Sequence, residues 1–338
     1  MSTNEKQTEA IYDAKTLGTG KVLVLGLQHM FAMFGATVLV PAITGLNVST
    51  TLLFAGLGTL LFHLITGRKV PAFLGSSFAF LGAYGLTTAA GQDIPLTYSG
   101  FGVAVAGLMY LVLALFFKIF GVKKVMRFFP PIVTGPVIIA IGLTLAGTAI
   151  SSCSGNWLVA LAAILVVVIC NIWGKGMIKI IPILLGVIVS YIVAMFVDPA
   201  ARENVVKTVA EAKWFGLPVI WEETALSIFG KDLDTGMLLT AVITIAPISL
   251  ATIVEHVGDM CAISSTVGKN YVADPGLHRT LIGDGLATTM SALFGGPPTP
   301  PTARTPVFWP SPRSMTPRSS AWLRCLPWFC PSAPSLPL

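Results

Sequence analysis

Apolar residues dominate long stretches of this chain, and short polar segments separate one stretch from the next. A helix needs roughly 20 mostly apolar residues to cross the hydrocarbon core of a bilayer. Nine stretches approach this length, and each predicts a membrane span. They cover residues 23–43, 51–66, 71–91, 98–118, 131–150, 156–174, 179–197, 236–258 and 279–295.

Composition supports the same interpretation. Of the 338 residues, 54% are hydrophobic and only 11% are charged, and the mean hydropathy is +0.81. A soluble protein of this size would need more polar surface. The five cysteines show no metal-ligand spacing, and no phosphate-binding GxxxxGK[ST] loop occurs. The sequence therefore predicts an all-α polytopic protein in a lipid bilayer, without a metal, a cofactor or an ATP site.

Lys and Arg residues fall in alternate loops. They occur before the first span and after the second, fourth and sixth spans: Lys15, Lys21, Arg68, Lys69, Lys118, Lys123, Lys124, Arg127, Lys175 and Lys179. The intervening loops 47–51, 92–97 and 151–156 contain none. Because cytoplasmic loops collect basic residues, we expect an inner-membrane protein with its amino terminus in the cytoplasm. The net charge of +6 reflects this topology and not nucleic-acid binding.

The third expected span departs from a uniform apolar pattern. It begins at Pro71 and carries Gly75, Ser76 and Ser77 near its middle, followed by Phe78. Broken segments of this kind mark the substrate site in many transporters. The alternative is that the small residues only allow close helix packing, and that Phe78 faces lipid or core.

The eighth expected span contains two carboxylates. Glu255 and Asp259 are four residues apart and share a helix face, whereas His256 points about 100° away from Glu255. An ionised group in a membrane is costly, so such residues usually face a cavity and serve a function. Desolvation favours a neutral carboxylate, which suits Glu255 for proton exchange. For Asp259 and His256 structural and functional roles are both open, and His29 in the first span is a supporting candidate.

Four segments carry a family resemblance. They are 28–41 (QHMFAMFGATVLVP), 71–80 (PAFLGSSFAF), 255–258 (EHVG) and 274–279 (DPGLHR). On these motifs the chain resembles the nucleobase–cation symporters, also called nucleobase–ascorbate transporters, and among them the bacterial uracil permeases. The resemblance implies secondary active, proton-coupled uptake of uracil, and no enzymatic activity.

The resemblance also implies an architecture of fourteen spans in two inverted repeats of seven, with a core and a gate domain. Short strands would interrupt spans three and ten. The chain would then divide into a cytoplasmic segment 1–22, core spans in 23–118, gate spans in 131–197, an external loop 198–235, core spans in 236–298, and an aberrant tail 299–338. We expect the external loop to lie on the membrane surface.

Site residues carried over from the family are Glu255, Phe78 and Ala36. Glu255 would accept N–H groups of uracil, Phe78 would offer its backbone and a ring edge, and Ala36 would line the pocket. Glu255, Asp259 and His29 would couple or support proton transfer. Some uracil permeases have a histidine where this chain has Asp259, so the usual relay assignment is open at that position.

The tail 299–338 differs from everything before it, with ten Pro, four Arg and no Asp or Glu. The family pattern after Pro298 would be N-T-T-Y-G-E-N, for example AAC ACC ACC TAC GGC GAG AAC. Deleting one A yields codons for Thr299 to Arg304 as found. We therefore expect a reading-frame slip that replaces the family's second substrate-binding acid with Arg304 and leaves this chain inactive. A natural disordered tail is the alternative.

Competing functions stay open at this point. Xanthine or uric acid is the alternative substrate within the same family. An ion channel or a polytopic membrane enzyme would be a different class, although no reactive nucleophile or metal cluster is visible. The sequence leaves the oligomeric state open, including a homodimer.

Overall fold

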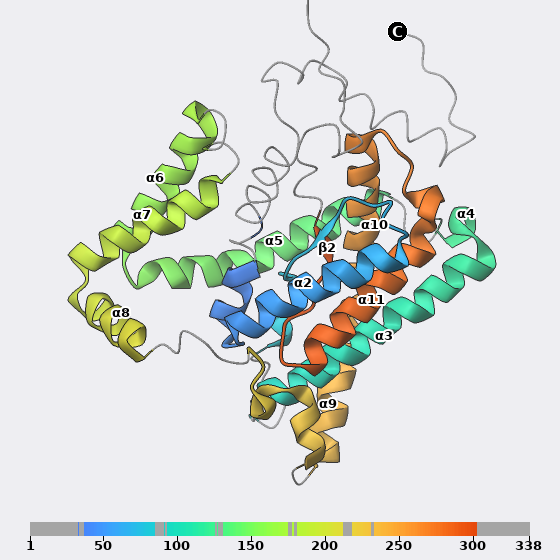
Figure 1. Cartoon of the computed structure of the whole chain (residues 1–338), viewed down its shortest axis with the longest axis horizontal. Helices are drawn as coiled ribbons and strands as arrows, with labels where there is room; N and C mark the ends of the chain where they lie inside the picture. Colours follow the sequence, from blue (N-terminus) through green and yellow to red (C-terminus); the bar gives the residue numbers. More distant parts are fainter. Residues whose placement is uncertain are drawn as a thin grey trace, which may run out of the picture.

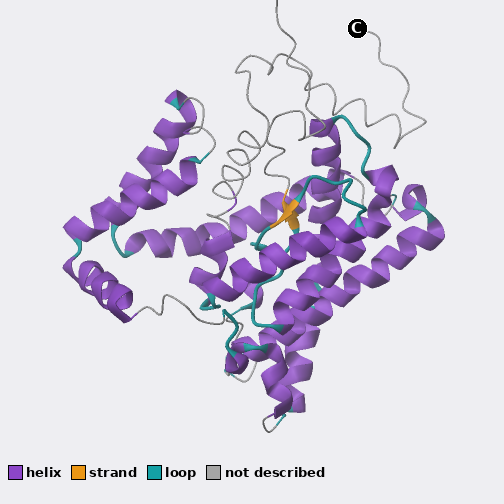
Figure 2. Cartoon of the chain, viewed as in Figure 1, coloured by secondary structure: helices purple, strands orange, loops and turns teal. Residues whose placement is uncertain are grey.

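The computed structural model describes residues 33, 37–84, 91, 93–125, 127, 131–174, 178, 181–211, 218–230 and 233–302. Helices make up most of this structure, together with one pair of two-residue strands (Figure 2). Two regions are evident in Figure 1. Helices α2, α3, α9, α10 and α11 pack into a bundle, whereas α6, α7 and α8 project to one side, and α5 runs between the two regions.

Small residues bring the bundle helices together. Helices α2 (Val48–Ile65), α3 (Leu96–Phe120) and α11 (Leu277–Leu293) share the most extensive contacts. A Cβ atom on Gly107 of α3 would lie 2.9 Å from the Gly285 carbonyl oxygen of α11, and one on Gly285 would lie 2.6 Å from that of Gly107. Glycine at both positions therefore lets the two backbones touch, as is typical of membrane helix interfaces.

Aromatic and aliphatic side chains fill the centre of the bundle. Phe62, Tyr110, Phe117, Met260 and Leu281 are all buried in one cluster that joins α2, α3, α10 and α11. A short helix α4 (Val122–Val125) and the turn η6 (Val272–Gly276) contact each other at one end of it.

Residues 71–84, the described part of the third expected span, are not a continuous helix. They contain strand β1 (Phe73–Leu74) and the 3₁₀ turn η2 (Leu81–Ala83). A spanning helix is therefore the wrong prediction for these residues, while the break expected at Gly75, Ser76 and Ser77 is present. Pro71 lacks an N–H group, and the backbone beyond it finds its partners in another segment instead.

That other segment is strand β2 (Pro301–Thr302), which pairs antiparallel with β1, so that Phe73 faces Thr302 and Leu74 faces Pro301. Gly75 N–H donates to the Pro300 carbonyl at 3.2 Å, and Ser77 N–H donates to the Pro298 carbonyl at 3.0 Å. Prolines are suited to this pairing because Pro298 and Pro300 contribute only their carbonyl groups to it. Residues 299–302, the first of the expected aberrant tail, thus lie within the fold.

The eighth expected span, 236–258, also differs from prediction. It consists of α9 (Thr235–Ile245) and α10 (Ile248–Val267), with a turn at Ala246 and Pro247 between them. A proline has no N–H group to donate within the helix, which accounts for the interruption. Glu255 therefore lies within α10, in its second turn, and α10 continues nine residues beyond the predicted end.

The projecting region contains α5 (Pro131–Ser154), α6 (Trp157–Trp173), α7 (Pro182–Val197) and α8 (Pro199–Glu211). Helices α6 and α7 pack on each other where Gly186 faces Val167. Most of their apolar side chains are exposed, among them Leu161, Ile164 and Ile188. In the described parts of α6 and α7, Cys170 and Gly186 are the buried residues.

Part of the expected external loop covers one end of the bundle. The turns η4 (Trp221–Glu223) and η5 (Ala225–Gly230) lie against α3 and the end of α11, and Ala225 and Ile228 are buried. Phe229 packs edge-on against Phe101 with ring centroids 5.7 Å apart. Residues 218–230 therefore pack on this end of the bundle, and their position on the membrane surface stays a prediction.

Three described helical stretches are long and apolar enough to cross a membrane: Val48–Ile65, Leu96–Phe120 and Thr235–Ser265. Helices α7 and α8 are bent by 111° and could count as a fourth. The ranges 131–150, 156–174, 179–197 and 279–295 are helical, as α5, α6, α7 and α11, but none of these helices is among the three. Several apolar helices confirm the prediction of a polytopic membrane protein, while the seven-plus-seven arrangement remains a prediction. The span 23–43 lies largely outside the described residues.

Candidate substrate-binding site

Glu255 lies in the second turn of α10, within the apolar stretch Thr235–Ser265. Its Oε2 atom is buried and has no hydrogen-bond partner in the part of the chain that the structure describes. A buried carboxylate oxygen without a partner is costly. Such an atom is available to a proton or to a ligand that donates a hydrogen bond.

The pair of short strands lies beside this helix, since α10 contacts β2. Four further buried hydroxyl oxygens lack partners within the described structure, and two of them flank the strands: Oγ of Ser77 after β1 and Oγ1 of Thr299 before β2. Phe78 follows in a bend and is half-buried. Three segments that are distant in sequence therefore contribute unsatisfied polar atoms to one part of the bundle.

His256 points into the bundle and is fully buried. Its Nδ1 atom lies 2.7 Å from Oδ2 of Asp284, and its Nε2 atom lies 3.0 Å from Oγ1 of Thr280. Both partners belong to α11. The sequence left structural and functional roles open for His256, and these contacts favour a structural one, because both ring nitrogens are used to hold α10 against α11.

Asp284 is a buried residue of the site that the sequence analysis did not select. One carboxylate oxygen meets His256, and the other accepts a weak hydrogen bond of 3.4 Å from Thr288, which itself accepts the backbone N–H of Thr299 at 3.2 Å. This chain of contacts joins α10 to Thr299, two residues before β2. The signal was available, because Asp284 is an acidic residue within an apolar span.

A second polar contact ties α10 to α3. The hydroxyl of Tyr110 donates to Oγ1 of Thr252 at 2.6 Å, and Thr252 in turn donates to the Ser249 carbonyl at 3.0 Å. Both side chains are buried. Because Thr252 lies one turn before Glu255, this contact fixes the part of α10 that carries the carboxylate.

The other predicted site residues divide into two groups. Asp259 lies on α10 one turn after Glu255 and is half-buried. Ala36 and His29 lie outside the described residues. The structure therefore places α10, which carries Glu255, in contact with β2, whose partner β1 precedes Phe78. The roles of all the predicted site residues stay predictions.

Comparison with known proteins places this site in a family. Residues 20–304 match the permease family. This range covers most of the chain, including α10, α11 and both strands. The chain therefore belongs to the permease family, a family of transporters and not of enzymes.

Three relatives illustrate the similarity. The chain is 42% identical over 289 residues to a probable uracil permease of Pasteurella multocida, covering 82% of this chain and 64% of the relative. It is 41% identical over 298 residues to the uracil permease of Bacillus caldolyticus, covering 85% of this chain and 65% of the relative. It is 34% identical over 289 residues to the uracil permease of Escherichia coli K12, covering 82% of this chain and 63% of the relative. The chain thus spans less than two thirds of the length of these relatives.

Proposed function

We propose that this chain is the larger part of a proton-coupled uracil permease. The observation that carries the proposal is the buried, unpartnered Oε2 of Glu255 on a helix that contacts the strand pair. The similarity to proteins named uracil permease supports the choice of substrate.

Uracil recognition follows from the donors and acceptors at the site. A planar pyrimidine offers ring N–H groups, and a carboxylate can accept two of them. Glu255 supplies this acceptor. Phe78 contributes its backbone and a ring edge from the segment after β1, and Ala36 lines the pocket. Backbone outside regular helices is tolerated at membrane depth where it lines such a cavity.

Proton coupling uses the same carboxylate. Binding a proton at Glu255 removes a charge from the low-dielectric interior and changes an acceptor into a donor. Proton occupancy and uracil binding then depend on one another. Asp259, one turn further along α10, and His29 are the proposed supporting groups.

Orientation and assembly complete the proposal. The Lys69 ammonium lies 2.6 and 2.8 Å from the two carboxylate oxygens of Asp274, so the loops after α2 and before α11 meet at one end of the bundle. We place this end, and the amino terminus, on the cytoplasmic side of the inner membrane. Residues 23–118 and 236–298 form the core domain, and 131–197 form the gate domain. The full-length permease is a candidate homodimer.

This 338-residue chain is proposed to be inactive. The reading-frame slip after Pro298 would leave Arg304 at the codon of the family's second substrate-binding acid.

One experiment tests the proposal directly. The gene is resequenced across the codons for Pro297 to Arg304, and the original and the one-base-repaired genes are expressed in cells that lack uracil uptake. We expect saturable, proton-dependent uptake of labelled uracil from the repaired gene alone. Uptake by the 338-residue chain would refute inactivity.

Two further outcomes of this experiment are informative. Glu255→Gln in the repaired protein should reduce uptake at least about a hundredfold, since it removes both the proton site and the double acceptor. Competition by unlabelled xanthine or uric acid, and not by uracil, would instead select the alternative substrates. Non-saturable flux would indicate a channel.

A further inference from the structure

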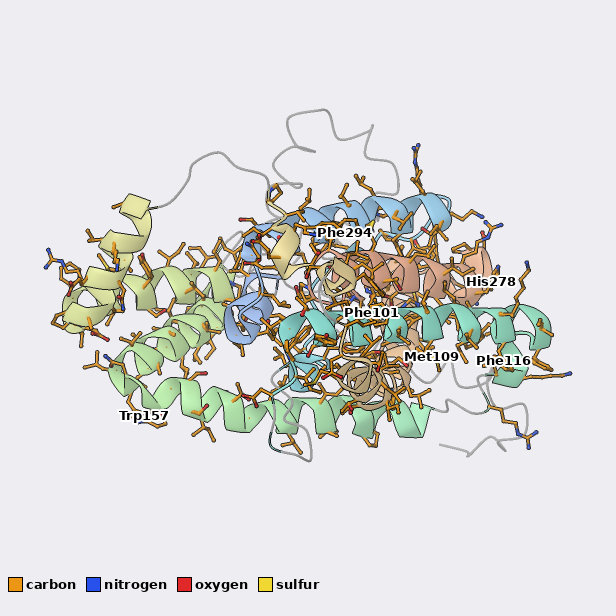
Figure 3. All side chains as sticks on the ribbon, turned by 90° about the horizontal axis from the view of Figure 1, so that it is seen from below. Phe101, Met109, Phe116, Trp157, His278 and Phe294 are labelled. Carbon is orange, nitrogen blue, oxygen red and sulfur yellow. The ribbon has the colours of Figure 1, made fainter. Side chains whose placement is uncertain are left out.

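The end of the bundle at which α3, α4, η6 and α11 meet carries an excess of positive charge. Lys118 on α3, Lys124 on α4 and Arg279 on α11 are all exposed there, followed by Arg127. Helix α4 contacts η6, which leads directly into α11. Figure 3 shows Phe116 of α3 and His278 of α11 at this same end.

His278 helps to define the geometry of this end. Its ring lies over Gly276, so close that a Cβ atom there would be 2.8 Å from the ring. His278 precedes the expected span 279–295, and its pKa is lowered, first by partial burial and then by the charges of Arg279 and Lys118. Lys118 and Arg279 therefore lie near the same imidazole, although they come from different helices.

Two ion pairs within the described residues are Lys69–Asp274 and His256–Asp284. In the part of the chain that the structure describes, Lys118, Lys124, Arg127 and Arg279 have no carboxylate partner. A group of cations without counter-charges attracts a multivalent or phosphate anion.

An apolar surface lies directly beside the cations. Leu115, one turn before Lys118 on the same face of α3, is 55% exposed, and Ile119 is 65% exposed. Phe116 and Phe120 stack with ring centroids 5.7 Å apart and are also exposed. Helix α3 is long and apolar enough to span a membrane and ends at Phe120, so Lys118 lies at its membrane-water boundary. Leu115 lies one turn deeper in the helix than Lys118, and Ile119 lies beside Lys118.

We propose that Lys118 and Arg279 bind the phosphate of an anionic phospholipid whose acyl chains lie along Leu115 and Ile119. A free phosphate ion would use the cations alone, whereas a phospholipid matches both the charge and the apolar surface. The inference depends on membrane insertion and not on the transported substrate. It therefore stands or falls separately from uracil uptake.

The test uses the full 338-residue chain, purified in a zwitterionic detergent. Fluorescent phosphatidylglycerol and phosphatidylcholine are titrated in turn, with inorganic phosphate as a competitor. We expect binding of phosphatidylglycerol that phosphatidylcholine does not reproduce and millimolar phosphate does not displace. The double variant Lys118→Gln/Arg279→Gln should weaken this binding at least about tenfold, at roughly fivefold for each charge near a lipid surface.

Matched variants make the result specific. Arg202→Gln/Lys207→Gln removes the same charge from α8 and should leave binding unchanged, and Lys118→Arg/Arg279→Lys should retain it. Circular dichroism of each variant checks that the helices are intact. An equal loss of phosphatidylglycerol binding in the α8 variant would overturn the proposal. So would displacement of phosphatidylglycerol by inorganic phosphate, or binding of phosphatidylcholine that is as tight as that of phosphatidylglycerol.

Discussion

The bundle and the projecting helices α6 and α7 are both strongly apolar, yet only the bundle helices bury a broad face. Helix α3 buries Ser99, Val103, Ala106, Tyr110 and other residues along its length. Helices α6 and α7 bury Cys170 and Gly186 in their described residues. Apolar composition alone therefore does not give a helix a broad buried face in this protein. Lipid solvates apolar side chains as well as another helix does, so it provides little driving force.

The features that distinguish the bundle are small residues and buried polar pairs. Gly107 meets Gly285 at the α3–α11 contact, and His256 meets Asp284 and Thr280 at the α10–α11 contact. The α6–α7 pair has one comparable feature, the approach of Gly186 to Val167. Helix association in membranes follows close backbone contact and interhelical hydrogen bonds.

The largest difference in stability between the two regions is expected when the buried contact of His256 with Asp284 is broken. His256→Ala leaves Asp284 buried without its partner, and we expect the free energy of unfolding to fall by about 3 kcal/mol. Asn171→Ala on α6 is the matched change, because within the described structure this amide bonds to the Val167 carbonyl of its own helix and not to another helix. Its effect should stay within about 0.5 kcal/mol.

Unfolding of the purified chain by sodium dodecyl sulfate in mixed micelles, followed by circular dichroism, measures both changes. Similar losses for His256→Ala and Asn171→Ala would contradict the view that interhelical polar contacts distinguish the bundle.

Replacing a glycine by alanine is expected to change the free energy of unfolding in opposite directions at Gly107 and Gly142. A Cβ atom on Gly107 would collide with Oγ1 of Thr289 and lie 2.9 Å from the Gly285 carbonyl oxygen, so Gly107→Ala should destabilise the bundle by about 2 kcal/mol. Among the described residues, none of the surrounding segments comes within 4 Å of the corresponding position on Gly142 of α5. Gly142→Ala should therefore stabilise by about 0.5 kcal/mol, since alanine favours helix. The same unfolding assay measures both changes in stability. If the two substitutions shift the free energy of unfolding in the same direction, backbone contact is not what holds α3 to α11.

Sequence reasoning recovered the features that depend on single residues. Pro71 with Gly75, Ser76 and Ser77 located the break in the third expected span. Glu255 was recognised because an acid within an apolar stretch is unusual, and the structure leaves its Oε2 atom buried and unpartnered. The break and the acidic residue are both local features, since each is recognised from the residues directly around it in the sequence.

Features that depend on distant partners were not recovered. Pro247 lies in an apolar run that hydropathy treats as continuous, so the division into α9 and α10 was missed. The contacts of η5 with α3 and α11 join segments that are far apart in the sequence, so no local pattern indicates them. Asp284 carried the same signal as Glu255, but its role depends on His256, which is 28 residues earlier in the chain.

The smallest change in the free energy of unfolding is expected at the exposed ion pair of Lys69 and Asp274. Lys69 and Asp274 form a bidentate contact, but their side chains are 49% and 71% exposed. Water and salt screen such a pair, so Lys69→Gln should lower the free energy of unfolding by less than about 0.5 kcal/mol in low salt and by less still in 1 M salt. Lys207→Gln on α8 is the matched control and should have a similarly small effect. A loss above about 1 kcal/mol at Lys69 that persists in 1 M salt would mean that this ion pair, and not only buried contacts, holds the loops after α2 and before α11 together.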